Sequence, residues 1–188
     1  MSCEFETLLG AMRKAAGAFR DAEIPFVLAG SVAVYAHGGP DTDHDVDFLV
    51  RPADADRALQ ALGGVGFRTY KPPEGWLYKA LDPAGAMIDV IFCPTTGPVD
   101  DALLERADVV EVHAIHVPVL SPTDVLASKL LALREHNLDY APMLEIARSL
   151  REQIDWSFVR SRTGDSPFAR AFFTLVEELG VVEPPAAA

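Results

Sequence analysis

Two carboxylates stand inside a run of residues that is otherwise typical of a buried strand. The run reads Asp45-Val46-Asp47-Phe48-Leu49-Val50. Side chains alternate between the two faces of a strand, so Asp45 and Asp47 point to one side while Val46 and Phe48 point to the other. Two carboxylates at this spacing repel each other unless a cation lies between them. Because Mg²⁺ prefers carboxylate oxygens, the run predicts a divalent metal site on a sheet.

A turn of small residues comes shortly before these carboxylates. Leu28 and Ala29 end an apolar run, and Gly30 and Ser31 open a helix-like segment. Glycine permits close approach of the backbone to a ligand, and the start of a helix attracts phosphate. We therefore expect Gly30 and Ser31 to meet the phosphates of a nucleoside triphosphate. No Gly-x-Ser-x-Gly elbow surrounds Ser31, which argues against a hydrolase nucleophile.

A third carboxylate lies in another strand-like run, Ile88-Asp89-Val90-Ile91-Phe92. Three carboxylates, two divalent ions (Mg²⁺ or Mn²⁺) and a displacement at phosphorus form a consistent mechanism. The simpler alternative is a solvated acidic edge. Asp43 shares the alternation and is a further candidate ligand. The acidic stretch that could be either a metal site or a solvated edge contains Asp41, Asp43, Asp45 and Asp47.

Apolar spacing and turn residues predict a protein of the α/β (α+β) class, with a mixed sheet flanked by helices and followed by a helical lobe. We expect strands at 25–29, 45–51, 66–70, 76–80, 86–92, 109–112 and 115–120, and helices at 4–22, 32–37 and 53–62. Helices near 122–135, 138–152, 155–163 and 167–179 follow. The expected domains are a sheet domain at 1–120, a helical lobe at 121–182 and a disordered tail at 183–188.

The composition excludes some classes of function. No apolar run of the 188 residues approaches the roughly 20 residues that a membrane span needs. The first residues lack a basic-then-apolar signal pattern, and the two cysteines form no framework, so we expect a cytoplasmic protein. The net charge of −12 disfavours non-specific binding of nucleic acid.

The order Gly30-Ser31, Asp45-x-Asp47 and Asp89 resembles the nucleotidyltransferase superfamily of the DNA polymerase beta type. The resemblance covers residues 24 to 92 by motif. It implies a nucleotidyltransferase-type sheet in residues 1–120, with Asp45, Asp47 and Asp89 as metal ligands and catalytic residues and NTP as the substrate.

The helical part resembles abortive-infection nucleotidyltransferases of the AbiEii type, which include toxins of toxin–antitoxin pairs. The resemblance rests on Lys129, Arg134 and Asp139. It implies that Lys129 contacts nucleotide phosphates and that the aspartate completes the site. The chain lacks the arginine that family members often carry before Asp-x-Asp, and Leu138-Asp139 replaces their Arg-Asp pair. A solvated helix face is the alternative for Lys129 and Arg134, and a helix start is the alternative for Asp139.

The sequence therefore leads to three hypotheses. The first is a metal-dependent nucleotidyltransferase that modifies RNA of the tRNA type, as a toxin with a cognate antitoxin protein. The second is a nucleotidyltransferase of small molecules such as aminoglycosides, which the acidic charge suits better. The third is an inactive binding or regulatory protein of the same fold, against which the three intact carboxylates argue. The basic residues that favour RNA are Arg148, Arg151, Arg160 and Arg162.

Overall fold

A computed structural model describes residues 3–40, 42 and 45–183. Its sheet has seven strands in the order β3-β4-β5-β2-β1-β7-β6. β1 and β2 are antiparallel, whereas β2 and β5 run parallel, so the sheet is mixed as expected. The strands are β1 (Phe26–Ala29), β2 (Val46–Val50), β3 (Arg68–Tyr70), β4 (Leu77–Leu81), β5 (Met87–Ile91), β6 (Asp108–Val112) and β7 (Ile115–Val119).

Two amphipathic helices cover one face of this sheet. Helix α1 (Cys3–Asp21) packs against β5, and α3 (Ala55–Gly64) packs against β3, β4 and β5. Three buried aromatic rings join α1 to the strands: Phe19 lies 5.2 Å from Phe48 and 5.5 Å from Phe26, measured between ring centroids. Because Phe48 points into this core, Asp47 must point to the opposite face.

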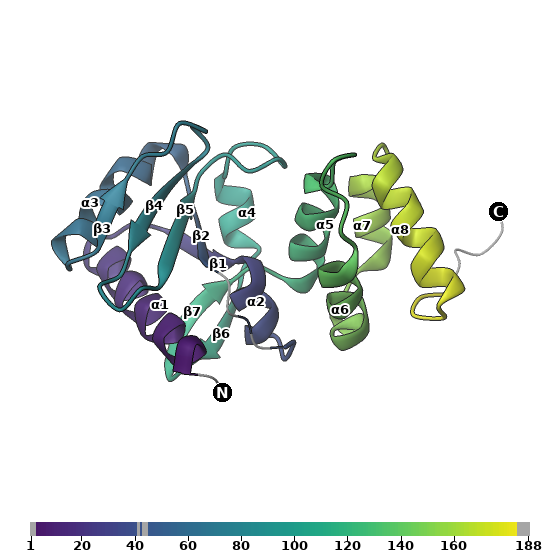
Figure 1. Ribbon diagram of the computed structural model, residues 1–188, viewed down its shortest axis with the longest axis horizontal. Coiled ribbons are helices and arrows are strands. Elements are labelled where there is room, and N and C mark those ends of the chain that lie inside the picture. Colours follow the sequence, from purple (N-terminus) through teal and green to yellow (C-terminus); the bar gives the residue numbers. More distant parts are fainter. Residues whose placement is uncertain (1–2, 41, 43–44, 184–188) are drawn as a thin grey trace.

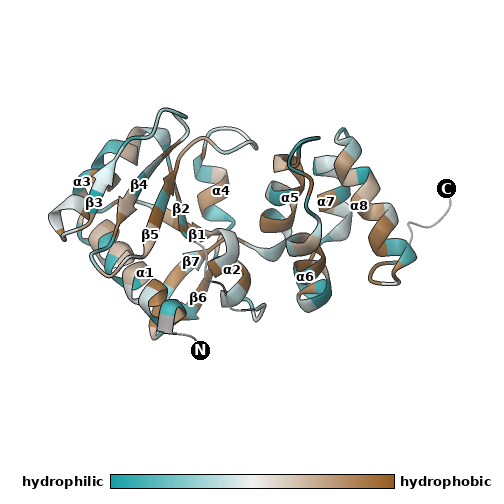
Figure 2. Cartoon of the chain, in the orientation of Figure 1, coloured by the Kyte–Doolittle hydropathy of each residue, from teal (hydrophilic) through white to brown (hydrophobic). Residues whose placement is uncertain are grey.

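The opposite face of the sheet looks toward the C-terminal helices (Figure 1). They are α5 (Pro122–Ala132), α6 (Ala141–Ser149), α7 (Trp156–Thr163) and α8 (Pro167–Glu178). Ser121 caps α5, since its side chain accepts a hydrogen bond from the backbone N–H of Asp124. Helix α2 (Gly30–Ala36) contacts both β2 and α5 and so connects the sheet with the helices. Brown segments in Figure 2 lie along the strands and along the helix faces that pack together.

Two expected helices have other bounds in the structure, and one helix was not predicted. Helix α5 ends at Ala132 and not at 135, because Arg134 and Asn137 pair as an isolated bridge in a turn. The next helix begins at Ala141, and a short 3₁₀ turn (Arg151–Gln153) replaces its expected last residues. Helix α4 (Asp101–Glu105) was not predicted, because five residues are too few to show a helical period.

The expected domain boundary falls between the end of β7 at Val119 and the start of α5 at Pro122. The division of the chain into two domains stays a prediction. The expected tail at 183–188 lies outside the described residues except for Glu183, as do Asp41, Asp43 and His44. In the described part of the chain, no helix is both long and apolar enough to span a membrane.

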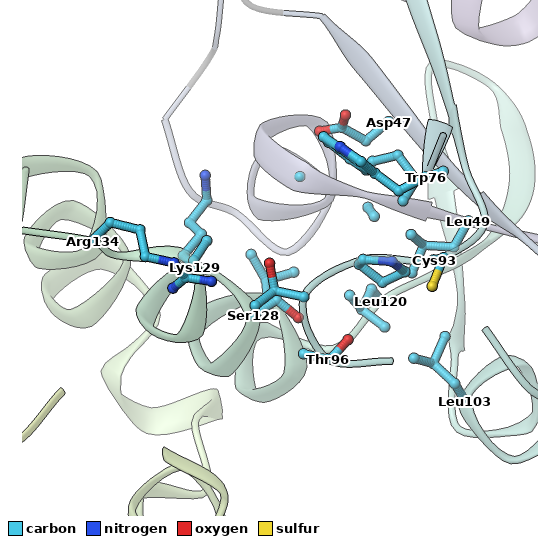
Figure 3. A pocket seen from close by; sticks show the side chains of 17 residues that line it. Asp47, Leu49, Trp76, Cys93, Thr96, Leu103, Leu120, Ser128, Lys129 and Arg134 are labelled. Carbon is cyan, nitrogen blue, oxygen red and sulfur yellow. The ribbon is translucent and has the colours of Figure 1, made fainter. Parts of the chain in front are cut away.

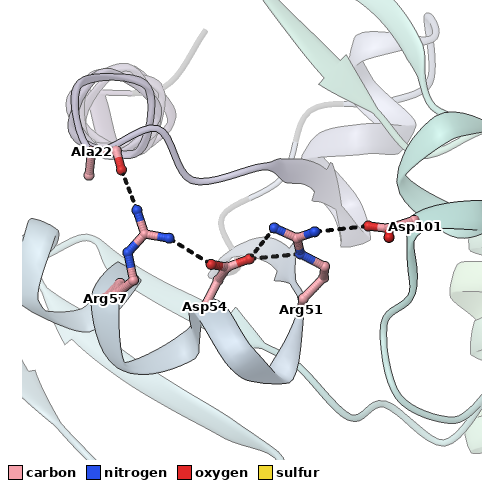
Figure 4. A network of polar contacts seen from close by, with 5 residues as sticks. All are labelled: Ala22, Arg51, Asp54, Arg57 and Asp101. Atoms are coloured by element: carbon pink, nitrogen blue, oxygen red, sulfur yellow. Dashed lines mark hydrogen bonds and ion pairs between the residues drawn. The ribbon is translucent and has the colours of Figure 1, made fainter.

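A network of hydrogen bonds and ion pairs around Asp54 connects α1, α3 and α4 (Figure 4). Asp54 is buried and accepts hydrogen bonds from Arg51 and Arg57 at 2.8 Å each. Arg57 also donates to the carbonyl of Ala22 just after α1, and Arg51 to Asp101 at the start of α4. Both cations satisfy the buried carboxylate, so this cluster positions α1, α3 and α4 relative to one another.

Candidate active site

The sheet brings two of the predicted carboxylates side by side. β2 and β5 are adjacent parallel strands, and Asp47 is the register partner of Asp89. Asp45 lies just before β2, and 49% of its side chain is exposed, whereas only 10% of the Asp89 side chain is exposed. The alternation that the sequence predicted therefore places all three carboxylates on the sheet face opposite Phe48.

Gly30 lies directly against the carboxylate of Asp47. Its backbone has φ of +63°, and a Cβ atom built at this position would lie 1.8 Å from Oδ2 of Asp47. Any side chain at Gly30 would therefore collide with the carboxylate. The glycine makes room for Asp47, which is a different reason for its presence from the phosphate contact that the sequence suggested.

Lys79 is a site residue that the sequence analysis missed. Its Nζ lies 2.7 Å from each carboxylate oxygen of Asp89 and 3.5 Å from Oδ2 of Asp45. Lys79 is the register partner of Asp89 across the antiparallel pair β4–β5. Counting back equally from the predicted turn at 82–85 would have set Lys79 opposite Ile88. In the structure Asp82 bonds to Ala86, and this register sets Lys79 opposite Asp89.

Two of the carboxylates, Asp47 and Asp89, have raised pKa values. Burial, followed by repulsion from Asp89, raises the pKa of Asp47 to about 7, although Lys129 and Lys79 oppose the increase. Burial also raises the pKa of Asp89 above its usual range, against the opposing effect of Lys79. The hydrogen bond to Asp89 raises the pKa of Lys79 in spite of desolvation. Packed carboxylates of this kind mark a place where additional positive charge is stabilising.

A cavity of about 520 Å³ opens beside Asp47, between the sheet and α5 (Figure 3). Its wall on the sheet side contains Asp47, Leu49, Ile91 and the exposed Trp76. The helix side and the segments that connect the two sides supply Leu103, Leu120, Val125, Ser128, Lys129 and Arg134. Asp47 is the one acidic residue of this lining within the described chain.

The structure brings both Lys129 and Arg134 to the wall of the cavity, but the two side chains have different partners. Lys129 faces the cavity and lowers the pKa of Asp47. Arg134 also lines the cavity, yet its guanidinium donates to the carbonyls of Leu131 and Leu133 at the end of α5.

Asp139 and Ser31 have local positions. Asp139 accepts a hydrogen bond from the N–H of Ala141 and so supports the start of α6. It lines a second, smaller cavity that it shares with Lys129. Ser31 is the second residue of α2 and is half-buried. These placements leave Lys129 as the helical residue with the clearest relation to the carboxylates.

The donor chemistry of Asp45, Asp47 and Asp89 fits a hard divalent cation, since all three offer carboxylate oxygens on one face. In the structure, however, the side chains of these three residues do not converge on a common point. Within residues 3–40, 42 and 45–183, no three His, Cys, Asp or Glu side chains converge as a metal-binding group. The ammonium of Lys79 lies between Asp45 and Asp89 instead.

A family model described as "Uncharacterised nucleotidyltransferase" matches residues 6–184. The chain belongs to this family. A nucleotidyltransferase acts on a nucleotide substrate, so membership supports an enzyme and supports the superfamily that the motifs of the sequence resemble. No curated protein matches the chain. Nothing in these comparisons relates this nucleotidyltransferase specifically to the AbiEii type.

Solved structures with this fold include the antibiotic-resistance factor ANT(2'')-Ia, which is 12% identical to this nucleotidyltransferase, with a TM-score of 0.64. That match covers 93% of this chain and 97% of the other. A candidate nucleotidyltransferase from Thermotoga maritima is 19% identical, with a TM-score of 0.53, over 77% and 90% of the two chains. The lincosamide antibiotic adenylyltransferase LnuA, solved with lincomycin, is 14% identical, with a TM-score of 0.50, over 82% and 97%. These likenesses confirm the nucleotidyltransferase-type fold.

Proposed function

We propose that the protein transfers a nucleoside monophosphate from an NTP to an acceptor hydroxyl and releases pyrophosphate. The observation that carries the proposal is the pairing of Asp47 and Asp89 in register on adjacent strands, with Lys129 in the wall of the cavity that Asp47 also lines. Carboxylates supply metal ligands and a base, and a lysine supplies charge for phosphate, so together they provide the parts that phosphoryl transfer needs.

Each residue has a distinct role in this proposal. Asp45 and Asp47 hold a divalent ion, Mg²⁺ or Mn²⁺, which neutralises phosphate charge when it is bound. Asp89 accepts the proton of the attacking hydroxyl. Gly30 lies beside Asp47, and Ser31 follows it at the start of α2, where the backbone would approach the phosphates. Lys129 stabilises the negative charge that is transferred.

Two residues that the resemblance implied have weaker support. Arg134 keeps its guanidinium on the carbonyls at the end of α5, so its contribution requires that these hydrogen bonds break. Asp139 supports the start of α6 and reaches the site only through the small cavity that it shares with Lys129. We propose both as secondary contacts of the nucleotide.

A small-molecule acceptor fits this cavity better than RNA does. The cavity of about 520 Å³ lies within the usual size range of small-ligand sites, and apolar side chains line most of it. Two of the structural neighbours are described as an antibiotic-resistance factor and as an antibiotic adenylyltransferase. We therefore favour a hydroxylated small molecule as the acceptor.

RNA modification in a cytoplasmic toxin–antitoxin role is the second proposal, and the exposed Arg148 and Arg162 favour it. The other arginines of the predicted basic cluster have internal partners. Arg160 pairs with Glu177 at 2.5 Å and stacks on Phe173, and Arg151 pairs with Glu152. These contacts reduce the charge that is available to an RNA backbone.

The test is to incubate the purified protein with each α-labelled NTP and Mg²⁺, either with total RNA or with a panel of hydroxylated antibiotics. We expect label on a small molecule with the wild-type protein and none with Asp47→Asn. Label on RNA would support the second proposal. Absence of label from every acceptor, combined with no NTP binding, would support an inactive binding protein.

A further inference from the structure

The side chain of Lys79 fills the space in which the carboxylates of Asp45 and Asp89 converge. Its ammonium is equidistant, at 2.7 Å, from both oxygens of Asp89 and lies 3.5 Å from Asp45. Three quarters of the Lys79 side chain is shielded from solvent. The contact is therefore an ion pair formed in the interior of the site and is distinct from the exposed pairs on the surface, such as Lys71 with Asp56.

We propose that the ammonium of Lys79 occupies one of the two cation positions of the carboxylate cluster, so that the site takes a single divalent ion, between Asp45 and Asp47. This inference rests on the proposed function only for the identity of the site. It replaces the two-ion arrangement that the sequence predicted, and it removes Asp89 from the metal ligands.

Coordination geometry supports the exclusion of a second ion. Mg²⁺ binds oxygen at about 2.0–2.1 Å and demands a nearly octahedral set of ligands. Both oxygens of Asp89 already accept hydrogen bonds from Nζ of Lys79. A metal ion on Asp89 would have to approach the ammonium closely, and the two cations would repel each other.

Charge balance supports the same conclusion. One divalent ion together with one ammonium equals the charge of three ionised carboxylates. Two divalent ions together with Lys79 would leave the site strongly positive before any nucleotide binds. The backbone also fixes the lysine opposite Asp89, because the two residues are register partners in the middle of the β4–β5 ladder. Displacing the side chain would leave a shielded carboxylate without its partner.

The decisive experiment counts Mn²⁺ ions bound per chain at about pH 8 without nucleotide, by calorimetry and by the electron paramagnetic resonance signal of free Mn²⁺. We expect one ion for the wild type and for Lys79→Arg, and two for Lys79→Met, which keeps the length of the side chain without its charge. Lys71→Met is the matched control and keeps one ion, because Lys71 pairs with the exposed Asp56.

Any wild-type count other than one overturns the inference, and so does a count for Lys79→Met that stays at one. Asp89→Asn provides the test if Lys79→Met does not fold. The inference predicts that Asp89→Asn keeps the single ion, and loss of that ion would overturn it. The count does not depend on nucleotide transfer, so failure of the proposed function and failure of this inference are distinguishable.

Discussion

The carboxylate of Asp47 lies in the space that a side chain at Gly30 would fill, because a Cβ atom there would come within 1.8 Å of Oδ2 and 2.8 Å of Cγ of Asp47. The turn between β1 and α2 therefore leaves room for the carboxylate of Asp47, the candidate catalytic residue on β2. This relationship explains why a glycine is needed at this turn even in the absence of a ligand.

Gly30→Ala should displace the Asp47 carboxylate and reduce nucleotide transfer at least tenfold, which corresponds to about 1.4 kcal/mol of activation free energy. Gly38→Ala is the matched control. Gly38 also has a positive φ, +95°, but its Cβ would meet nothing within 4 Å. Both variants carry the backbone strain of a left-handed alanine, roughly 1–2 kcal/mol. Equal loss of transfer in both would show that strain, and not the carboxylate, is responsible.

Stability should depend on pH through Asp47. Its pKa is raised from 3.8 to about 7 by folding, so the folded chain holds more protons than the unfolded chain between these values. The contribution of Asp47 to the free energy of unfolding therefore falls as the pH rises from about 4 to about 7. Urea unfolding at about pH 5 and pH 8 should show this fall in the wild type and a smaller one in Asp47→Asn. An identical pH dependence in both proteins would contradict the raised pKa.

Binding of a divalent ion should weaken below about pH 7, because the protonated form of Asp47 cannot act as a ligand. The measurement is Mn²⁺ affinity across this range. An affinity that does not change with pH would exclude Asp47 as a ligand.

Lys129→Met should raise the KM for NTP or slow transfer, by about 1–3 kcal/mol for the loss of a charge-assisted hydrogen bond. It should also raise the pKa of Asp47 further, since Lys129 lowers it in the wild type. Kinetics as a function of pH would report both effects. Lys71→Met serves as the control. Wild-type kinetics in Lys129→Met would show that Lys129 is only a solvated residue of the helix and does not contact the nucleotide.

Asp54→Asn should lower the thermal midpoint without changing the chemistry of the site. The buried carboxylate holds Arg51 and Arg57, and loss of its charge should cost about 1–3 kcal/mol. Asp101→Asn should have little effect, because 70% of the Asp101 side chain is exposed. Differential scanning calorimetry distinguishes the two, and equal midpoints for both variants would contradict this account of the network.

The sequence predicted the sheet and the face on which the carboxylates lie, because alternation within a strand is a local property. It could not establish that Asp89 lies beside Asp47, since this depends on the parallel pairing of β2 with β5, which joins residues 42 positions apart in the chain. Lys79 was missed for a different reason. A lysine in an amphipathic strand is usually solvated, and only the register of the hairpin reveals its partner.

The helical lobe was harder to predict than the sheet. Its four main helices were expected, but the ends of α5 and α6 depend on the turn at Arg134 and Asn137, which is a tertiary detail. The roles of Arg134 and Asp139 came from resemblance and are still predictions. Both residues lie in the segment between α5 and α6, and their local hydrogen bonds show why a sequence motif does not by itself direct a side chain toward the carboxylates.

Metal-dependent binding of a non-hydrolysable NTP analogue tests the central claim most directly, since it requires no knowledge of the acceptor. Calorimetry with and without Mg²⁺ should compare the wild type with Asp47→Asn and with the Asp101→Asn control. We expect binding that needs Mg²⁺, persists in Asp101→Asn and is lost in a folded Asp47→Asn protein. Binding that is equally strong without Mg²⁺, or that is unchanged in Asp47→Asn, would contradict it.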